Sequence, residues 1–198
     1  MKMKYAAGRA LVVLMMASVC QAKEPPTQVV YRFDDHRYLE LKGWDCEGEL
    51  WYTDTLRGIH SEPVSQFYRI FTKKFVHPSE RYIAITGWGV GGFRVSKDYG
   101  KTWQVAQFSP GENEPDGMNS PPRDDVLSFT VVNDQGFLQT KQPLFAGPAW
   151  GLVYITKEAL ENDTAKFHTN YQNLPDKVPE VKGYTGWDHM RCDMGAGR

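Results

Sequence analysis

Short runs of β-branched and aromatic residues recur along this chain, and most are separated by Gly, Pro, Asp or Ser. Such runs with turn-forming residues between them are typical of the strands of a β-meander. The expected strands cover residues 27–33, 38–41, 49–53, 66–76, 82–86, 92–96, 103–108, 126–133, 136–140 and 150–156. Only residues 157–162 have the composition of a helix, and Gly136 is expected in a hairpin turn. The sequence therefore predicts an all-β fold, either an antiparallel sandwich or an incomplete, propeller-like meander with one short helix.

The first 22 residues have the three parts of a secretory signal peptide. The basic start contains Lys2, Lys4 and Arg9. The apolar stretch covers residues 10–19, and the cleavage signal is Cys20-Gln21-Ala22. The apolar stretch is shorter than the roughly 20 residues that span a bilayer, so a membrane anchor is not expected. We predict cleavage after Ala22, which would leave a single β-rich domain of residues 23–198.

A lipoprotein is the alternative, because Cys20 follows the apolar stretch as lipid-modified cysteines do. Val19 argues against it, since Gly, Ala or Ser normally precedes a lipidated cysteine. A membrane tether is therefore expected only if Cys20 carries a lipid.

Cleavage would also change the charge of the protein. The whole chain has a net charge of −1, and the first 22 residues contain three basic and no acidic residues. The remaining residues contain 20 Lys and Arg and 24 Asp and Glu, which gives a net charge of about −4. No basic run interleaved with aromatic residues is present, so a nucleic-acid partner is not expected.

The loss of Cys20 would leave an even pair, Cys46 and Cys192, in a compartment that oxidises thiols. We predict a disulfide that closes a loop of about 145 residues and stabilises the fold by roughly 3–5 kcal/mol in chain-entropy models. Two separate buried thiols are the alternative. Two cysteines without a CxxC spacing do not indicate a zinc site.

Residues 96–103, Ser-Lys-Asp-Tyr-Gly-Lys-Thr-Trp, match the Asp-box pattern Ser-x-Asp-x-Gly-x-Thr-Trp at every defined position. Asp98 can accept backbone N–H bonds within the turn, Gly100 permits a positive φ, and Trp103 supplies an apolar anchor. In sialidases and other β-propellers the Asp-box lies away from the catalytic centre, so it predicts hairpin architecture rather than glycoside chemistry. The predicted structural residues are Ser96, Asp98, Gly100, Thr102 and Trp103.

No pattern in the sequence indicates catalysis or a cofactor. A Gly-x-Ser-x-Gly elbow is absent, and the histidines lack a metal-ligand spacing. Asp34-Asp35-His36 and Asp188-His189 are better interpreted as solvated turns than as metal ligands. The glycine-rich residues 87–92 lack the Lys-Ser/Thr and the helix of a phosphate loop. We predict no catalytic residue, no metal and no cofactor.

An acidic segment, residues 109–125, and the tryptophans beside glycines are the candidates for contact with a partner. Loops longer than about 12–15 residues tend to be functional or mobile, and both alternatives remain open for this segment. Aromatic side chains beside glycines are the more open of the aromatic residues. The predicted partner-binding residues are Trp44, Trp88, Glu112, Glu114 and Asp116.

With the export signal, residues 44–54 (Trp-Asp-Cys-Glu-Gly-Glu-Leu-Trp-Tyr-Thr-Asp), the Asp-box and the C-terminal cysteine, the chain resembles a family of immunity proteins. These act against lipase effectors of the bacterial type VI secretion system. The resemblance implies a non-enzymatic protein of the periplasm that binds a cognate secreted lipase effector and occludes its active site. Two alternatives are an exported carbohydrate-binding or sialidase-like Asp-box protein and an envelope protein with a structural role.

Overall fold

The structure is a computed structural model, which describes residues 23–90, 92–107, 122–132, 135–141, 152–155 and 179–198. Within these residues eleven strands form three sheets, as predicted for an all-β fold. The strands are β1 Thr27–Arg32, β2 Arg37–Trp44, β3 Glu47–Asp54, β4 Ile59–Arg69, β5 Lys74–Val76, β6 Ile83–Thr86, β7 Gly92–Ser96, β8 Gln104–Gln107, β9 Val126–Val132, β10 Gln135–Thr140 and β11 Leu152–Ile155. One turn of 3-10 helix, Arg123–Asp125, precedes β9, and the helix expected at 157–162 lies outside the described residues.

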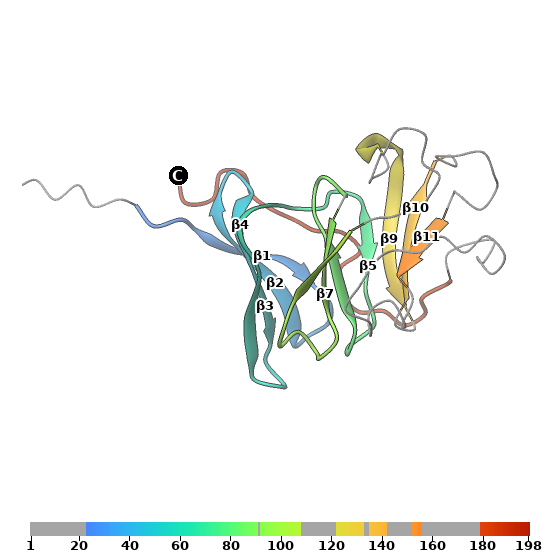
Figure 1. Cartoon of the computed structure of the whole chain (residues 1–198). Helices are drawn as coiled ribbons and strands as arrows, with labels where there is room; N and C mark the ends of the chain where they lie inside the picture. The colour runs from blue at the N-terminus through green and yellow to red at the C-terminus, as the bar shows by residue number, and fades with distance from the viewer. Residues whose placement is uncertain (1–22, 91, 108–121, 133–134, 142–151, 156–178) are drawn as a thin grey trace, which may run out of the picture.

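The three sheets follow one another along the molecule (Figure 1). The N-terminal sheet has the order β1-β2-β3-β4, and the central sheet has the order β6-β7-β8. The third sheet has the order β11-β10-β9-β5, in which β5 pairs with β9 in parallel. The antiparallel meander is therefore confirmed for the first two sheets, whereas the third is mixed because β5 comes from the chain between them.

One hydrophobic core joins the three sheets. Along β2 buried and half-buried residues alternate, which is the pattern of a strand with one face on the core. Phe93 of the central sheet lies 5.2 Å from Phe129 of the mixed sheet, between ring centroids, and Phe75 stacks on Phe129 at 5.7 Å. All three rings are almost fully buried. In the described part of the chain, this main cluster includes residues of all three sheets, and a second, small cluster contains Val132 and Phe137.

Two strand predictions were wrong in detail. The predicted strand 66–76 is two elements, the end of β4 and the short β5, with a non-strand connection between them. The first part of β4 was missed because residues 59–65 include Pro63 and several polar residues, which are tolerated in β4 as an outer strand. Gly136 lies in β10 opposite Val131 rather than in the turn, because two residues suffice to connect β9 to β10.

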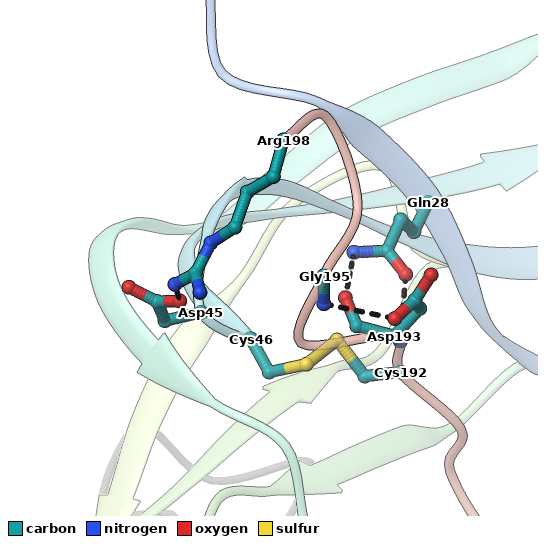
Figure 2. The surroundings of a disulfide bond; sticks show 7 residues. All are labelled: Gln28, Asp45, Cys46, Cys192, Asp193, Gly195 and Arg198. Carbon is teal, nitrogen blue, oxygen red and sulfur yellow. Dashed lines mark hydrogen bonds and ion pairs between the residues drawn. A yellow bond between two sulfur atoms is a disulfide. The ribbon is translucent and has the colours of Figure 1, made fainter.

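The C-terminal tail is fixed to the β2–β3 turn by a disulfide between Cys46 and Cys192, the predicted pair (Figure 2). Their Cα atoms lie 6.0 Å apart across a sequence separation of 146 residues. Next to the disulfide, Gln28 and Asp193 exchange two hydrogen bonds, of 2.8 and 3.1 Å, between the Gln28 amide and the Asp193 backbone. The disulfide therefore joins the last residues of the chain to the first sheet.

The tail also bonds to two sheets through its backbone. The N–H groups of Trp187 and Arg191 donate to carbonyl oxygens of β1 at 2.8 Å each. On the other side, the N–H of Phe75 in β5 donates to the carbonyl of Asp188 at 2.7 Å. The tail therefore lies between the N-terminal and the mixed sheet and connects them.

The turn after β7 is held by hydrogen bonds to the side chains of Ser96 and Asp98. The Asp98 carboxylate accepts from the backbone N–H of Thr102 at 2.9 Å, from its hydroxyl at 2.8 Å and from the Ser96 hydroxyl at 2.8 Å. The N–H of Gly100, at φ +88°, donates to the Ser96 hydroxyl oxygen at 2.8 Å. Partial burial acts to raise the pKa of Asp98, but the hydrogen bonds from Thr102 and Ser96 outweigh it and hold the pKa below its usual range. The carboxylate is thus engaged in holding the turn.

Replacing Gly100 with alanine is expected to lower the free energy of unfolding by about 2–4 kcal/mol. A Cβ at this position would lie 2.2 Å from the ring of Tyr52, which is fully buried, and the positive φ adds strain. Gly58→Ala is the matched control, because Gly58 also has a positive φ but open space around it. Urea denaturation should show a clearly larger loss for Gly100→Ala, and equal losses would contradict the steric explanation.

Candidate interaction surface

A bulge in β4 exposes a large aromatic side chain. Val64 and Tyr68 both pair with residues of β3. Three residues of β4, 65–67, lie between these two pairs, whereas β3 has one residue there. Phe67 adopts φ +58°, a region that bulky residues rarely occupy. Its side chain is 75% exposed, whereas the neighbouring Tyr68 is buried. The bulge, residues 65–67, therefore turns Phe67 outward, a common result of extra residues in an outer strand.

Trp88 lies beside this bulge, in the connection between β6 and β7. Its backbone N–H donates to the carbonyl of Arg69 in β4 at 3.0 Å, which holds the connection against the strand. The indole is 44% exposed. The guanidinium carbons of Arg69 and Arg123 lie 5.9 and 4.3 Å from its ring centroid, within cation–π range. Trp88 is thus held by a backbone hydrogen bond and by two guanidinium groups near its ring, while part of the ring faces solvent.

Three hollows of the surface meet at Phe67. The first, of about 300 Å³, lies between Phe67 and Trp88 and is also lined by Arg94. The second, of about 560 Å³, is lined by Phe67, Arg94 and Val105. The third, of about 540 Å³, separates Phe67 from Trp44. We call the area formed by Phe67, Trp88, Arg94 and Val105 the Phe67 surface.

The Phe67 surface concentrates exposed apolar side chains. Of the six large apolar residues that are exposed in the described residues, three belong to it: Phe67, Trp88 and Val105. Val105 is 58% exposed and belongs to β8, so the surface spans the N-terminal and the central sheet. Contiguous exposed apolar groups of this kind mark interaction sites more often than single ones do.

The structure places Trp88 on this surface and Trp44 at the third hollow, opposite Phe67. Trp44 is half-buried, and the Lys23 ammonium lies 5.6 Å from its ring centroid. The predicted Glu112, Glu114 and Asp116 lie outside the described residues.

Phe67 and Arg94 were not among the predicted contact residues, because only the bulge and the pairing of β7 bring them to the surface. Pro63 in a strand-like run was the one available signal of an irregular β4, and it indicates no particular aromatic residue.

The possible metal ligands of the described residues serve a turn. Asp34, Asp35 and His36 bring their ligand atoms within 4.8 Å of one another. The Asp34 carboxylate, however, accepts from the Arg37 side chain at 2.6 Å and from the backbone N–H groups of His36 and Arg37 at 3.0 and 2.7 Å. The Asp34 carboxylate therefore stabilises the β1–β2 turn.

A β-rich domain whose acidic clusters stabilise turns, and whose exposed aromatic residues gather at one surface, has the features of a protein that acts by binding. A family comparison specifies the kind of binding. The model of the type VI secretion system Tli3 immunity proteins matches residues 23–139, and the chain belongs to this family. As a member, it is an immunity protein, whose partner is a cognate type VI secretion effector.

No curated protein matches the chain. Among the helices of the described residues, none is both long and apolar enough to cross a membrane.

Proposed function

We propose that this immunity protein works in the periplasm, where it binds a lipase effector of the type VI secretion system and covers the entrance to its active site. The family match over residues 23–139 is the observation that carries the proposal. A protein that inhibits an enzyme by blocking the entrance to its active site needs a rigid surface, and it needs no catalytic group. The hydrogen-bonded Asp-box turn and the disulfide provide such a rigid framework around the Phe67 surface.

Two features support action in the periplasm. The family match begins at residue 23, directly after the proposed cleavage site. The disulfide between Cys46 and Cys192 belongs in an oxidising compartment, because thiols are kept reduced in the cytosol. We therefore infer that residues 1–22 direct export and that the protein folds and oxidises after it.

The apolar character of the Phe67 surface supports a lipase as the target. An enzyme that acts on membrane lipid needs an apolar approach to its catalytic cleft, and exposed aromatic and aliphatic side chains complement such a surface. A stable complex of this kind buries roughly 1,600 Å² in total, so the contact would extend beyond the Phe67 surface.

The test uses purified lipase effectors of the type VI secretion system, beginning with any that is encoded beside the gene of this chain. Added in increasing amounts, the oxidised domain of residues 23–198 should lower phospholipase activity in proportion and abolish it near a 1:1 ratio. In cells, export of the effector to the periplasm should be lethal alone and tolerated with the full chain. The full chain should protect, whereas a form without residues 1–22 should not. Binding without loss of activity would contradict coverage of the active site, and protection by the non-exported form would contradict periplasmic action.

A further inference from the structure

Phe67 is held in an unfavourable conformation, and the contacts of the described residues do not compensate for it. A positive φ in a bulky residue costs free energy, and such positions tend to occur at functional sites. The ring is 75% exposed and has no aromatic partner among the described residues. Large aromatic residues that become buried on association contribute most to binding at protein interfaces. The bulge is therefore explained if the ring is buried by a partner.

Arg94 is the second unusual residue of the surface. It lies in β7, the middle strand of the central sheet, directly between Ile85 of β6 and Val105 of β8. Residues opposite each other in antiparallel strands share a face, so the guanidinium group has apolar neighbours on both sides. Arg94 is half-buried and has no carboxylate partner among the described residues.

Several arginines near the N-terminal sheet do have carboxylate partners, although Arg32 of β1 lies over the Tyr38 ring instead. Arg37 and Arg57 bond to Asp34 and Asp54 at 2.6 and 2.9 Å. Arg69, beside Phe67, also pairs with a carboxylate, Glu47. A guanidinium group in a half-buried, apolar surrounding is favourable when it binds a carboxylate through two hydrogen bonds. Within the described residues, Arg94 is thus open to an acidic group of a partner, although Glu62 lines one of the same hollows.

Phe67 and Arg94 line the same two hollows, one on each side of the bulge. We propose that they form one recognition pair, in which Phe67 enters an apolar socket of the effector and Arg94 binds an Asp or Glu side chain at its rim. This inference rests on the proposed function, since it names the part of the effector that the Phe67 surface contacts. An effector that has the apolar socket but lacks the acidic side chain at its rim would leave Arg94 desolvated and unpaired. Phe67 and Arg94 together would therefore also discriminate between effectors.

The test measures, by calorimetry, how oxidised variants of the domain bind the purified lipase effector that the unmodified domain inhibits. Phe67→Gly should weaken binding about 30-fold or more, as expected for a residue that dominates an interface. Because glycine accepts a positive φ, the urea midpoint of this variant should not fall, which separates a role in binding from a role in folding. Arg94→Gln should weaken binding about tenfold or more, Arg94→Glu more strongly, and Arg94→Lys least.

Two exposed residues outside the hollows provide matched controls. Leu56→Ala removes an apolar side chain that is 73% exposed at the β3–β4 turn, and Lys101→Glu reverses an exposed charge in the Asp-box turn. Both should bind the effector within twofold of the unmodified domain.

The outcomes separate this inference from the proposed function. If the unmodified domain binds no lipase effector of this kind, the proposed function is wrong. If it binds and inhibits, but Phe67→Gly and Arg94→Glu bind as well as the controls, only the recognition pair is wrong. Binding of the domain to anionic phospholipid vesicles that is lost in Arg94→Glu would assign Arg94 to a lipid phosphate and overturn the carboxylate assignment.

Discussion

Replacing Cys192 with serine is expected to lower the free energy of unfolding by about 3–5 kcal/mol. The disulfide to Cys46 closes a loop across 146 residues. Its removal therefore increases the entropy of the unfolded chain more than the removal of a disulfide that closes a short loop would. Urea denaturation of the oxidised domain and of the variant measures the difference. Cys192 is the better position for the change, because it is half-buried whereas Cys46 is buried.

Reduction of the unmodified domain is the control for this prediction. With a reductant present, the domain and Cys192→Ser should unfold at the same urea concentration. Hydrogen exchange should show that protection is lost first in the tail, at the N–H groups of Trp187 and Arg191 that bond to β1. An unchanged urea midpoint after reduction would contradict the stabilising role of the disulfide.

Acidification from pH 6.5 to 4.5 is expected to lower the free energy of unfolding by about 2.5 kcal/mol through His77 alone. The His77 ring is fully buried between Phe33 and Phe75, at centroid distances of 5.1 and 5.9 Å. Its Nε2 accepts the backbone N–H of Ala84 at 3.0 Å, so the ring is neutral with its proton on Nδ1. Burial, and next the positive charge of Arg37, lower the pKa of His77 to about 3.

The direction follows from which state binds the proton. Well above pH 6.5 neither state holds the proton, so His77 causes no pH dependence there. Between pH 6.5 and about 3, His77 binds a proton in the unfolded chain but not in the folded protein. The free energy of unfolding therefore decreases as the pH falls. Asp54 and Asp98 act in the same direction at lower pH. Burial acts to raise the pKa of each carboxylate, but hydrogen bonds outweigh it and hold the pKa below its usual range.

Urea denaturation of His77→Gln between pH 7.5 and 4.5 tests the assignment. The glutamine carbonyl can still accept from Ala84, and the side chain does not titrate. The variant should be less stable at pH 7.5 because of poorer packing, but it should lose about 2.5 kcal/mol less on acidification. If His77→Gln loses as much stability on acidification as the unmodified protein does, His77 is not the group responsible.

The parts of this fold that depend on local pattern could be predicted from the sequence. Alternating residues such as Leu39 and Leu41 in β2 and the turn residues of the Asp-box determine their own conformation, because the interacting groups are near in sequence. The cysteine pair was predictable for a different reason, since an even count after the proposed cleavage leaves one possible partner.

The remaining features depend on contacts between distant segments. The parallel pairing of β5 with β9 requires two strands from different halves of the chain. The exposure of Phe67 depends on how many residues of β4 face β3, and a run of strand-forming residues does not reveal that register. The Phe67 surface was therefore predicted only in part, through Trp88.

The bulge in β4 and the tail along β1 have a common consequence for the N-terminal sheet. β1 and β4 are its two outer strands, and outer strands with free backbone groups recruit strands from other molecules and promote aggregation. The tail occupies backbone carbonyls of β1, while Pro63 and the residues 65–67 interrupt the regular edge of β4. The protein can therefore display an exposed aromatic ring without offering a straight edge for self-assembly. A chain clipped before the tail would lose this protection on the β1 side.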